Sequence, residues 1–135
     1  MNEKKEFLIM IVDDNEQNRL VLQREVQKGL PLVYPGLSFK TLSAENGQLA
    51  LDLLLLHEFD LVLMDVDMPV MDGLTATEKI KADPNFKAIP VLAITAQAMK
   101  GDEEKCRAAG CDEYISKPID RKRLKELIGK RLGLV

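Results

Sequence analysis

Five short apolar runs alternate with longer segments whose apolar residues recur at helical spacing, and this alternation constrains the fold more than any other feature. A buried parallel strand has a continuous apolar run, because helices cover both faces of its sheet. We therefore predict strands over residues 7–12, 39–44, 61–64, 91–94 and 114–115. Helices are predicted over residues 15–28, 47–57, 73–82 and 98–109, and after Asp120. The predicted fold class is α/β, a doubly wound five-stranded parallel sheet with five helices.

The length of 135 residues suits one domain with one hydrophobic core. We predict a single domain over residues 1–135, with its core at about 7–132, since the sequence shows no repeat or low-complexity tract. We interpret Met1 as the native start and find no output domain after Leu132, so we expect a stand-alone protein. The segment Gly29–Gly36 contains two Pro and two Gly, which predicts an extended connection before the second strand.

Charge and residue counts exclude several classes of function. Nineteen Lys and Arg oppose 22 Asp and Glu, whereas a surface that binds DNA needs a basic surplus, so no DNA partner is expected. The single histidine, His57, excludes a multi-histidine metal site, and the C-x4-C spacing of Cys106 and Cys111 does not suit zinc. No signal peptide or membrane span is visible. We expect a cytoplasmic protein with two reduced thiols and no membrane partner.

Three carboxylates follow predicted strands that would be neighbours in the sheet. Asp13 and Asp14 follow the first strand, and Asp65 closes the third. We carry over the flavodoxin-like strand order 2-1-3-4-5 as an expectation from known doubly wound folds; if the sheet has this order, ligands bind at the carboxyl ends of strands one and three, where the order reverses. Clustered carboxylates repel one another unless a cation lies among them, and Mg²⁺ is a hard cation that takes oxygen ligands. We therefore expect these three side chains to meet and to bind Mg²⁺.

Thr95 and Lys117 end the fourth and fifth predicted strands at the same edge of the sheet. A hydroxyl, an ammonium and a metal-binding acidic pocket suit phosphoryl transfer, because the phosphoryl oxygens must be neutralised while a nucleophile attacks in line. A carboxylate can be that nucleophile, and the product is then an acyl phosphate.

Four motifs carry a resemblance to a known family. They are Ile-Val-Asp13-Asp14-Asn15, Leu-Met-Asp65-Val-Asp67-Met-Pro69-Val-Met-Asp72-Gly73, Ala-Ile-Thr95-Ala96 and Tyr114-Ile-Ser-Lys117-Pro118. In this order, and at the ends of these strands, they resemble the receiver domains of bacterial two-component response regulators over roughly residues 7–132. The stretch Ala98-Met-Lys-Gly-Asp-Glu-Glu is most similar to stand-alone receivers and to receivers of hybrid kinases.

The resemblance implies a role for each matching residue. Asp65 would be the phosphoacceptor and a metal ligand, and Asp13 and Asp14 would bind Mg²⁺ together with the backbone carbonyl of Asp67. Lys117 would bind a phosphoryl oxygen, and the Lys117–Pro118 peptide bond would be cis. Thr95 would move toward the phosphoryl group, and Tyr114 would swing inward behind it.

The resemblance also implies partners. A histidine kinase or a histidine phosphotransfer protein would supply the phosphoryl group, and a downstream protein would bind the face formed by the fourth helix, fifth strand and fifth helix. The chain would be a monomer or a weak dimer. It would promote its own phosphorylation and dephosphorylation rather than turn over a substrate.

Two features depart from the usual family pattern, and three alternatives stay open. The 29–36 connection is long, and the acidic side chain of Asp67 leaves the lifetime of the acyl phosphate open. The chain could be a receiver excised from a hybrid histidine kinase, or a pseudo-receiver that only docks. Asp65 and Asp67 also match the D-x-D core of haloacid-dehalogenase-like phosphatases, although that motif normally follows the first strand of a larger domain.

Overall fold

The computed structural model describes residues 4–68, 71–96 and 101–134. Its centre is a five-stranded sheet in the order β2-β1-β3-β4-β5, in which every neighbouring pair is parallel. The sheet type and strand order are therefore as predicted. Each strand contains all of its predicted residues and is one or two residues longer than predicted. The strands are β1 (Glu6–Val12), β2 (Ser38–Ala44), β3 (Leu61–Asp65), β4 (Val91–Thr95) and β5 (Glu113–Ser116).

Four of the predicted helices form where the sequence places them. The helices that begin at Gly47, Gly73 and Arg121 each follow a residue whose side-chain oxygen accepts the amide N–H three residues later, which is an N-cap. The helix Asp102–Ala109 ends at Gly110, which takes a left-handed φ of 106°. Its predicted start, at Ala98 and Met99, lies outside the described residues, and the prediction is wrong at Gly101, which precedes the helix as its N-cap with a left-handed φ of 98°. The helices are α3 (Gly47–Leu56), α4 (Gly73–Ala82), α5 (Asp102–Ala109) and α6 (Arg121–Arg131).

The first helical segment is longer than predicted, and the prediction of an extended connection over Gly29–Gly36 is wrong for its first half. The segment consists of α1 (Glu16–Arg24), the π-helical turn η1 (Glu25–Gly29) and α2 (Leu30–Val33). Pro31, which has no N–H to donate, follows the π-helical turn, and the preceding N–H, of Leu30, bonds back to the carbonyl of Glu25. The chain turns only at Gly36, with φ +88°.

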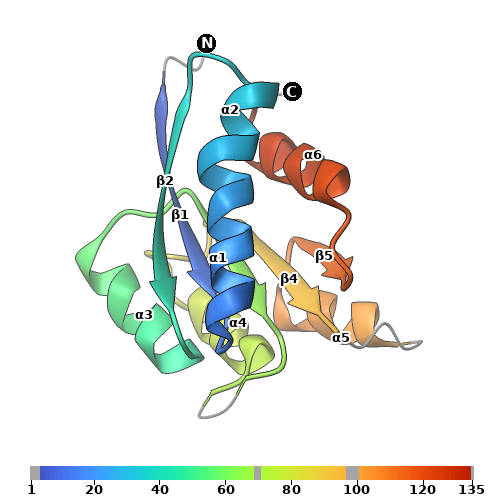
Figure 1. Cartoon of the computed structure of the whole chain (residues 1–135). Helices are drawn as coiled ribbons and strands as arrows, with labels where there is room; N and C mark the ends of the chain where they lie inside the picture. Colours follow the sequence, from blue (N-terminus) through green and yellow to red (C-terminus); the bar gives the residue numbers. More distant parts are fainter. Residues whose placement is uncertain (1–3, 69–70, 97–100, 135) are drawn as a thin grey trace.

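Helices cover both faces of the sheet (Figure 1). Along β1, Ile9 and Ile11 belong to a core cluster with α1, η1, α2 and α6, while Met10 and Val12 belong to a second cluster with α3, α4 and α5. This double burial explains why the strands have continuous apolar runs. Polar chemistry is consequently confined to the edges of the sheet, where the strands end.

Among the described residues, no helix combines the length and the apolar character that crossing a bilayer requires.

Candidate functional site

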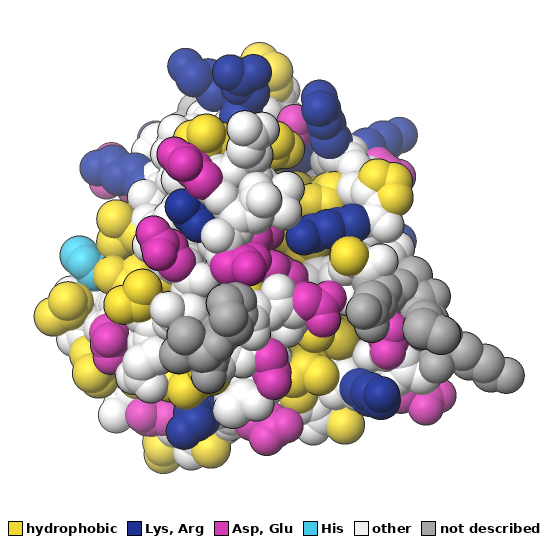
Figure 2. Space-filling view, turned by 60° about the horizontal axis from the view of Figure 1, so that its bottom comes forward, with side chains coloured by type: hydrophobic (Ala, Val, Ile, Leu, Met, Phe, Trp, Pro, Cys, Tyr) yellow, Lys and Arg dark blue, Asp and Glu magenta, His cyan; other side chains and the backbone are white. Residues whose placement is uncertain are grey.

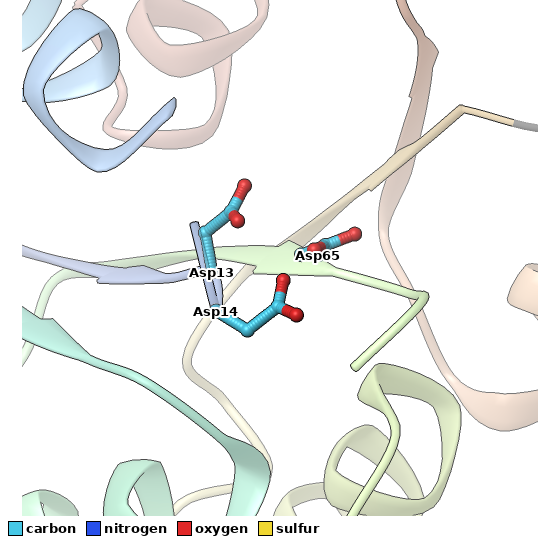
Figure 3. A group of neighbouring side chains, drawn as sticks. All are labelled: Asp13, Asp14 and Asp65. Atoms are coloured by element: carbon cyan, nitrogen blue, oxygen red, sulfur yellow. The ribbon is translucent and has the colours of Figure 1, made fainter. Parts of the chain in front are cut away.

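Three carboxylates meet at the carboxyl edge of the sheet, as predicted. Asp13 follows β1, Asp65 is the last residue of β3, and these two strands are paired. Carboxylate oxygens of Asp13, Asp14 and Asp65 all lie within 4.8 Å of one another (Figure 3). Asp13 and Asp65 are 1% and 4% exposed, whereas Asp14 is open to solvent. The strand order thus concentrates negative charge where two of the groups have almost no water.

Hydrogen bonds hold Asp13 at several points. Its amide donates to the carbonyl of Ala44 at 3.1 Å, and its Oδ1 accepts the amide N–H of Asn15 at 2.8 Å. Its carbonyl accepts Nη1 of Arg19 at 2.8 Å. Its Oδ2 is buried without a hydrogen bond and lies 3.6 Å from Nζ of Lys117. This oxygen is therefore an anionic acceptor that makes no hydrogen bond and has one charged neighbour, Lys117.

The surroundings of Asp65 disfavour its charged form. Burial, and next the charge of Asp13, raise the pKa of Asp65 from 3.8 to about 6, although Lys117 and a hydrogen bond from the Asp67 amide lower it. The Asp67 N–H donates to Oδ1 of Asp65 at 3.1 Å. Figure 2 looks onto this edge and shows acidic side chains gathered at the centre of the face. A cation among them would relieve this repulsion.

Thr95 and Lys117 lie beside the carboxylates. Thr95 ends β4 and is buried, and the amide of Lys117 donates to its carbonyl at 2.7 Å. The Lys117–Pro118 bond is cis, as the resemblance implies. Sequence reasoning therefore placed both residues correctly at this edge.

A small pocket adjoins the buried threonine. It has a volume of about 180 Å³, and Thr95, Asp67, Lys105 and Cys106 are among the residues that line it. Tyr114, on β5, is half-buried, and its pKa is raised by burial and then by the charge of Asp102. Tyr114 therefore lies near α5, on the strand next to Thr95.

The donor set fits Mg²⁺. All the clustered groups are carboxylate oxygens, the ligands that this ion prefers, and neither cysteine belongs to the cluster. The orphaned Oδ2 of Asp13 is an acceptor that a cation or its bound water would satisfy.

Arg19, whose Nη1 donates to the carbonyl of Asp13, was not identified from the sequence. The available signal was an arginine one turn into the helix that follows the Asp13–Asp14 pair.

The raised pKa of Asp65 predicts how the stability of the metal-free protein depends on pH. Because the folded state keeps this proton up to about pH 6 while the unfolded chain loses it near 3.8, stability from this group is complete below 3.8 and is lost as the pH rises through 6. The loss is at most about 3 kcal/mol. Urea unfolding in EDTA between pH 4 and 7.5 measures it.

Asp65→Asn is the control for this titration, since it lacks the ionisable group. The unfolding free energy of the variant should rise relative to wild type as the pH increases to 6, and the difference should then level off. A difference that does not vary with pH would show that Asp65 is not destabilising when charged.

The chain matches the response regulator receiver domain family over residues 9–129. It is 42% identical over 125 residues to the polar-differentiation response regulator DivK of Brucella anthropi, covering 93% of this chain and 95% of that protein. The DivK of Brucella ovis gives the same identity and coverage. These matches span all four motifs.

Solved structures share the fold. The receiver domain of a sensor histidine kinase from Pseudomonas aeruginosa, solved with a magnesium ion coordinated in its active-site cleft, is 31% identical, with a TM-score of 0.81 over 94% of this chain and 98% of that one. The receiver domain of a DNA-binding response regulator from Colwellia psychrerythraea is 27% identical, with a TM-score of 0.82 over 94% and 98%. The chain therefore belongs to the response regulator receiver domains of two-component signalling.

Proposed function

We propose that Asp65 accepts a phosphoryl group from a phosphohistidine and that the resulting acyl phosphate switches the surface of this domain. The observation that carries the proposal is the convergence of Asp65 with Asp13 and Asp14 within 4.8 Å, beside the Lys117 ammonium. A buried, crowded carboxylate with a lysine nearby is suited to hold a phosphoryl group once a cation balances its charge.

The chemistry follows from the two oxygens of Asp65. Oδ1 accepts the Asp67 amide, which leaves Oδ2 to attack phosphorus. The new O–P bond forms as the P–N bond of the phosphohistidine breaks, and the electron pair of that bond stays on the imidazole. Mg²⁺, bound by Asp13, Asp14, Asp65 and the Asp67 backbone carbonyl, would neutralise charge on the phosphoryl oxygens.

Lys117 and Thr95 would complete the site. The Lys117 ammonium now faces Oδ2 of Asp13 at 3.6 Å, and a phosphoryl oxygen would offer it a second anionic partner. We propose that the Thr95 hydroxyl turns toward that group and that Tyr114 moves into the pocket behind it. Phosphorylation adds about −1.5 to −2 charges, enough to shift such a two-state element.

As a receiver domain of two-component signalling, the chain works with a histidine kinase and a downstream partner. We propose that a kinase or a histidine phosphotransfer protein supplies the phosphoryl group. We further propose that the downstream protein binds the face of α5, β5 and α6, and that residues 1–135 act in the cytoplasm as one receiver domain, monomeric or weakly dimeric. A receiver that belongs to a hybrid kinase would use the same site.

Metal removal tests the proposed function. Incubation with acetyl phosphate and Mg²⁺ should add one phosphoryl group per chain, observed by intact mass, and treatment with base should remove it, as an acyl phosphate requires. EDTA should reduce the labelling to background, because the phosphoryl oxygens and carboxylates would then repel.

The outcome against the proposal is equally specific. Labelling that persists in EDTA, or labelling that resists base, would contradict a metal-assisted acyl phosphate. Sustained release of phosphate from small phosphate esters would instead favour a phosphatase that uses Asp65 and Asp67.

A further inference from the structure

One peptide unit joins two of the three clustered carboxylates. Asp13 is buried, and its amide and side chain are held by Ala44 and Asn15. Asp14 is exposed, so the direction of its carboxylate depends on the backbone that carries it. The orientation of the peptide between Asp13 and Asp14 therefore determines whether both side chains face Asp65 (Figure 3).

Arg19 holds this peptide from the first helix. Its Nη1 donates to the carbonyl oxygen of Asp13 at 2.8 Å, and its own amide donates to the carbonyl of Asn15 at 3.1 Å. Helical side chains lean toward the N-terminus of their helix, so an arginine one turn inside α1 reaches back to the end of β1. Because the peptide is planar, a fixed carbonyl of Asp13 also fixes the N–H of Asp14.

Two roles for Arg19, repelling a cation by its charge and holding the Asp13–Asp14 peptide in place, predict opposite changes in Mg²⁺ affinity when Arg19 is replaced. Arg19 forms an ion pair with none of the carboxylates in the described part of the chain. A cation beside a metal site repels the metal, so removing the charge alone would tighten Mg²⁺ binding. Displacing one of the carboxylates that would ligate Mg²⁺ would instead weaken Mg²⁺ binding, because this ion requires nearly ideal octahedral geometry. The sign of the change therefore separates the two roles.

We propose that Arg19 is a positioning residue, which orients the Asp13–Asp14 peptide so that both carboxylates face one cation. The inference deepens the proposed function and rests on it, since it takes Mg²⁺ as the ion. In this role Arg19 would act through the main-chain carbonyl of Asp13 and not through direct contact with the ion or the phosphoryl group.

Calorimetric titration of the intact protein with Mg²⁺, without any phosphodonor, tests the inference. Arg19→Met keeps most of the apolar stem and removes both charge and donors. Its dissociation constant should rise about tenfold, the lower end of the effect of losing an outer partner of a metal ligand. Arg19→Lys keeps the charge and one donor and should recover most of this loss.

Arg24→Met is the matched control, because it removes the same charge from an exposed position on the same helix and should leave the dissociation constant unchanged. Unfolding in EDTA shows that each variant is folded. The inference is overturned if Arg19→Met binds Mg²⁺ as tightly as wild type or more tightly, or if Arg19→Lys is no better than Arg19→Met. A wild-type protein that binds no Mg²⁺ would instead contradict the proposed function itself.

Discussion

Asp65→Asn is expected to lower labelling by acetyl phosphate by at least about a hundredfold, because a neutral amide is a far weaker nucleophile than a carboxylate. The substitution nearly preserves shape, and in the metal-free protein it removes the charge whose burial raises the pKa of Asp65 to about 6. The variant should therefore be folded and at least as stable as wild type at neutral pH. Intact mass after incubation with acetyl phosphate and Mg²⁺ measures the label.

Two variants make this result interpretable. Asp52→Asn removes the same charge from an exposed position on α3 and should label like wild type. Asp67→Asn keeps the backbone N–H that bonds Asp65 and should also take up label, whereas a phosphatase that needs Asp67 as its general acid would lose turnover. Wild-type labelling of Asp65→Asn would show that another residue accepts the phosphoryl group.

Gly73→Ala is expected to lower the free energy of unfolding by about 3 kcal/mol, the upper range for overpacking a buried site. Gly73 is the first residue of α4, and it is buried. A Cβ there would overlap the carbonyl oxygen of Asp65 and lie 2.9 Å from its carbonyl carbon and from Cγ of Met64. These atoms belong to the end of β3, so relief of the overlap must change the packing of α4 against β3, and we expect it to displace the backbone of Asp65. Urea unfolding measures the loss.

The same variant should label poorly with acetyl phosphate, because the displaced carboxylate no longer meets Asp13 and Asp14. Gly36→Ala is the comparison. Its φ of +88° makes alanine costly by about 1–2 kcal/mol, but nothing lies within 4 Å of the added methyl. It should lose stability and keep its labelling. If Gly73→Ala retains both wild-type stability and labelling, the approach of α4 to β3 does not position Asp65.

The strands could be predicted because their physical cause is local, whereas the strand order is an expectation carried over from known doubly wound folds. Strands buried on both faces need continuous apolar runs, and the ends of parallel strands share one edge, so the meeting of Asp13 with Asp65 follows from the strand order. The position of Thr95 beside Lys117 follows from the same rule.

The helical nature of residues 29–33 could not be predicted from local signals, because long-range packing overrides the breakers. Leu30 is fully buried in the core, and Glu25 pairs with Lys125 of α6 at 3.4 Å. The ring of Tyr34 lies against Gly129 of α6, where any side chain would collide with its hydroxyl. These contacts stabilise a helix that Pro31 alone would discourage.

The role of Arg19 was missed for a different reason. A pattern of residue types shows which side chains can ligate a metal, but Arg19 bonds a main-chain carbonyl, and that contact depends on the angle between β1 and α1. Asp67 is a second residue that bonds through its main chain, since it is its amide N–H that donates to Asp65. The type of its side chain therefore could not show this contact.

The unbroken helical segment from Glu16 to Val33 has a mechanical consequence. At roughly 1.5 Å per residue it is about 25 Å long, and it runs from beside the acidic edge of the sheet to the opposite edge, where β1 and β2 begin (Figure 1). Because Glu25, near its middle, pairs with Lys125 of α6 at 3.4 Å and Leu30, in its last turn, is buried in the core, its first turn beside the acidic edge cannot shift without straining those contacts. Leu32 and Val33, 85% and 50% exposed, carry the C-terminal end of this segment to the surface.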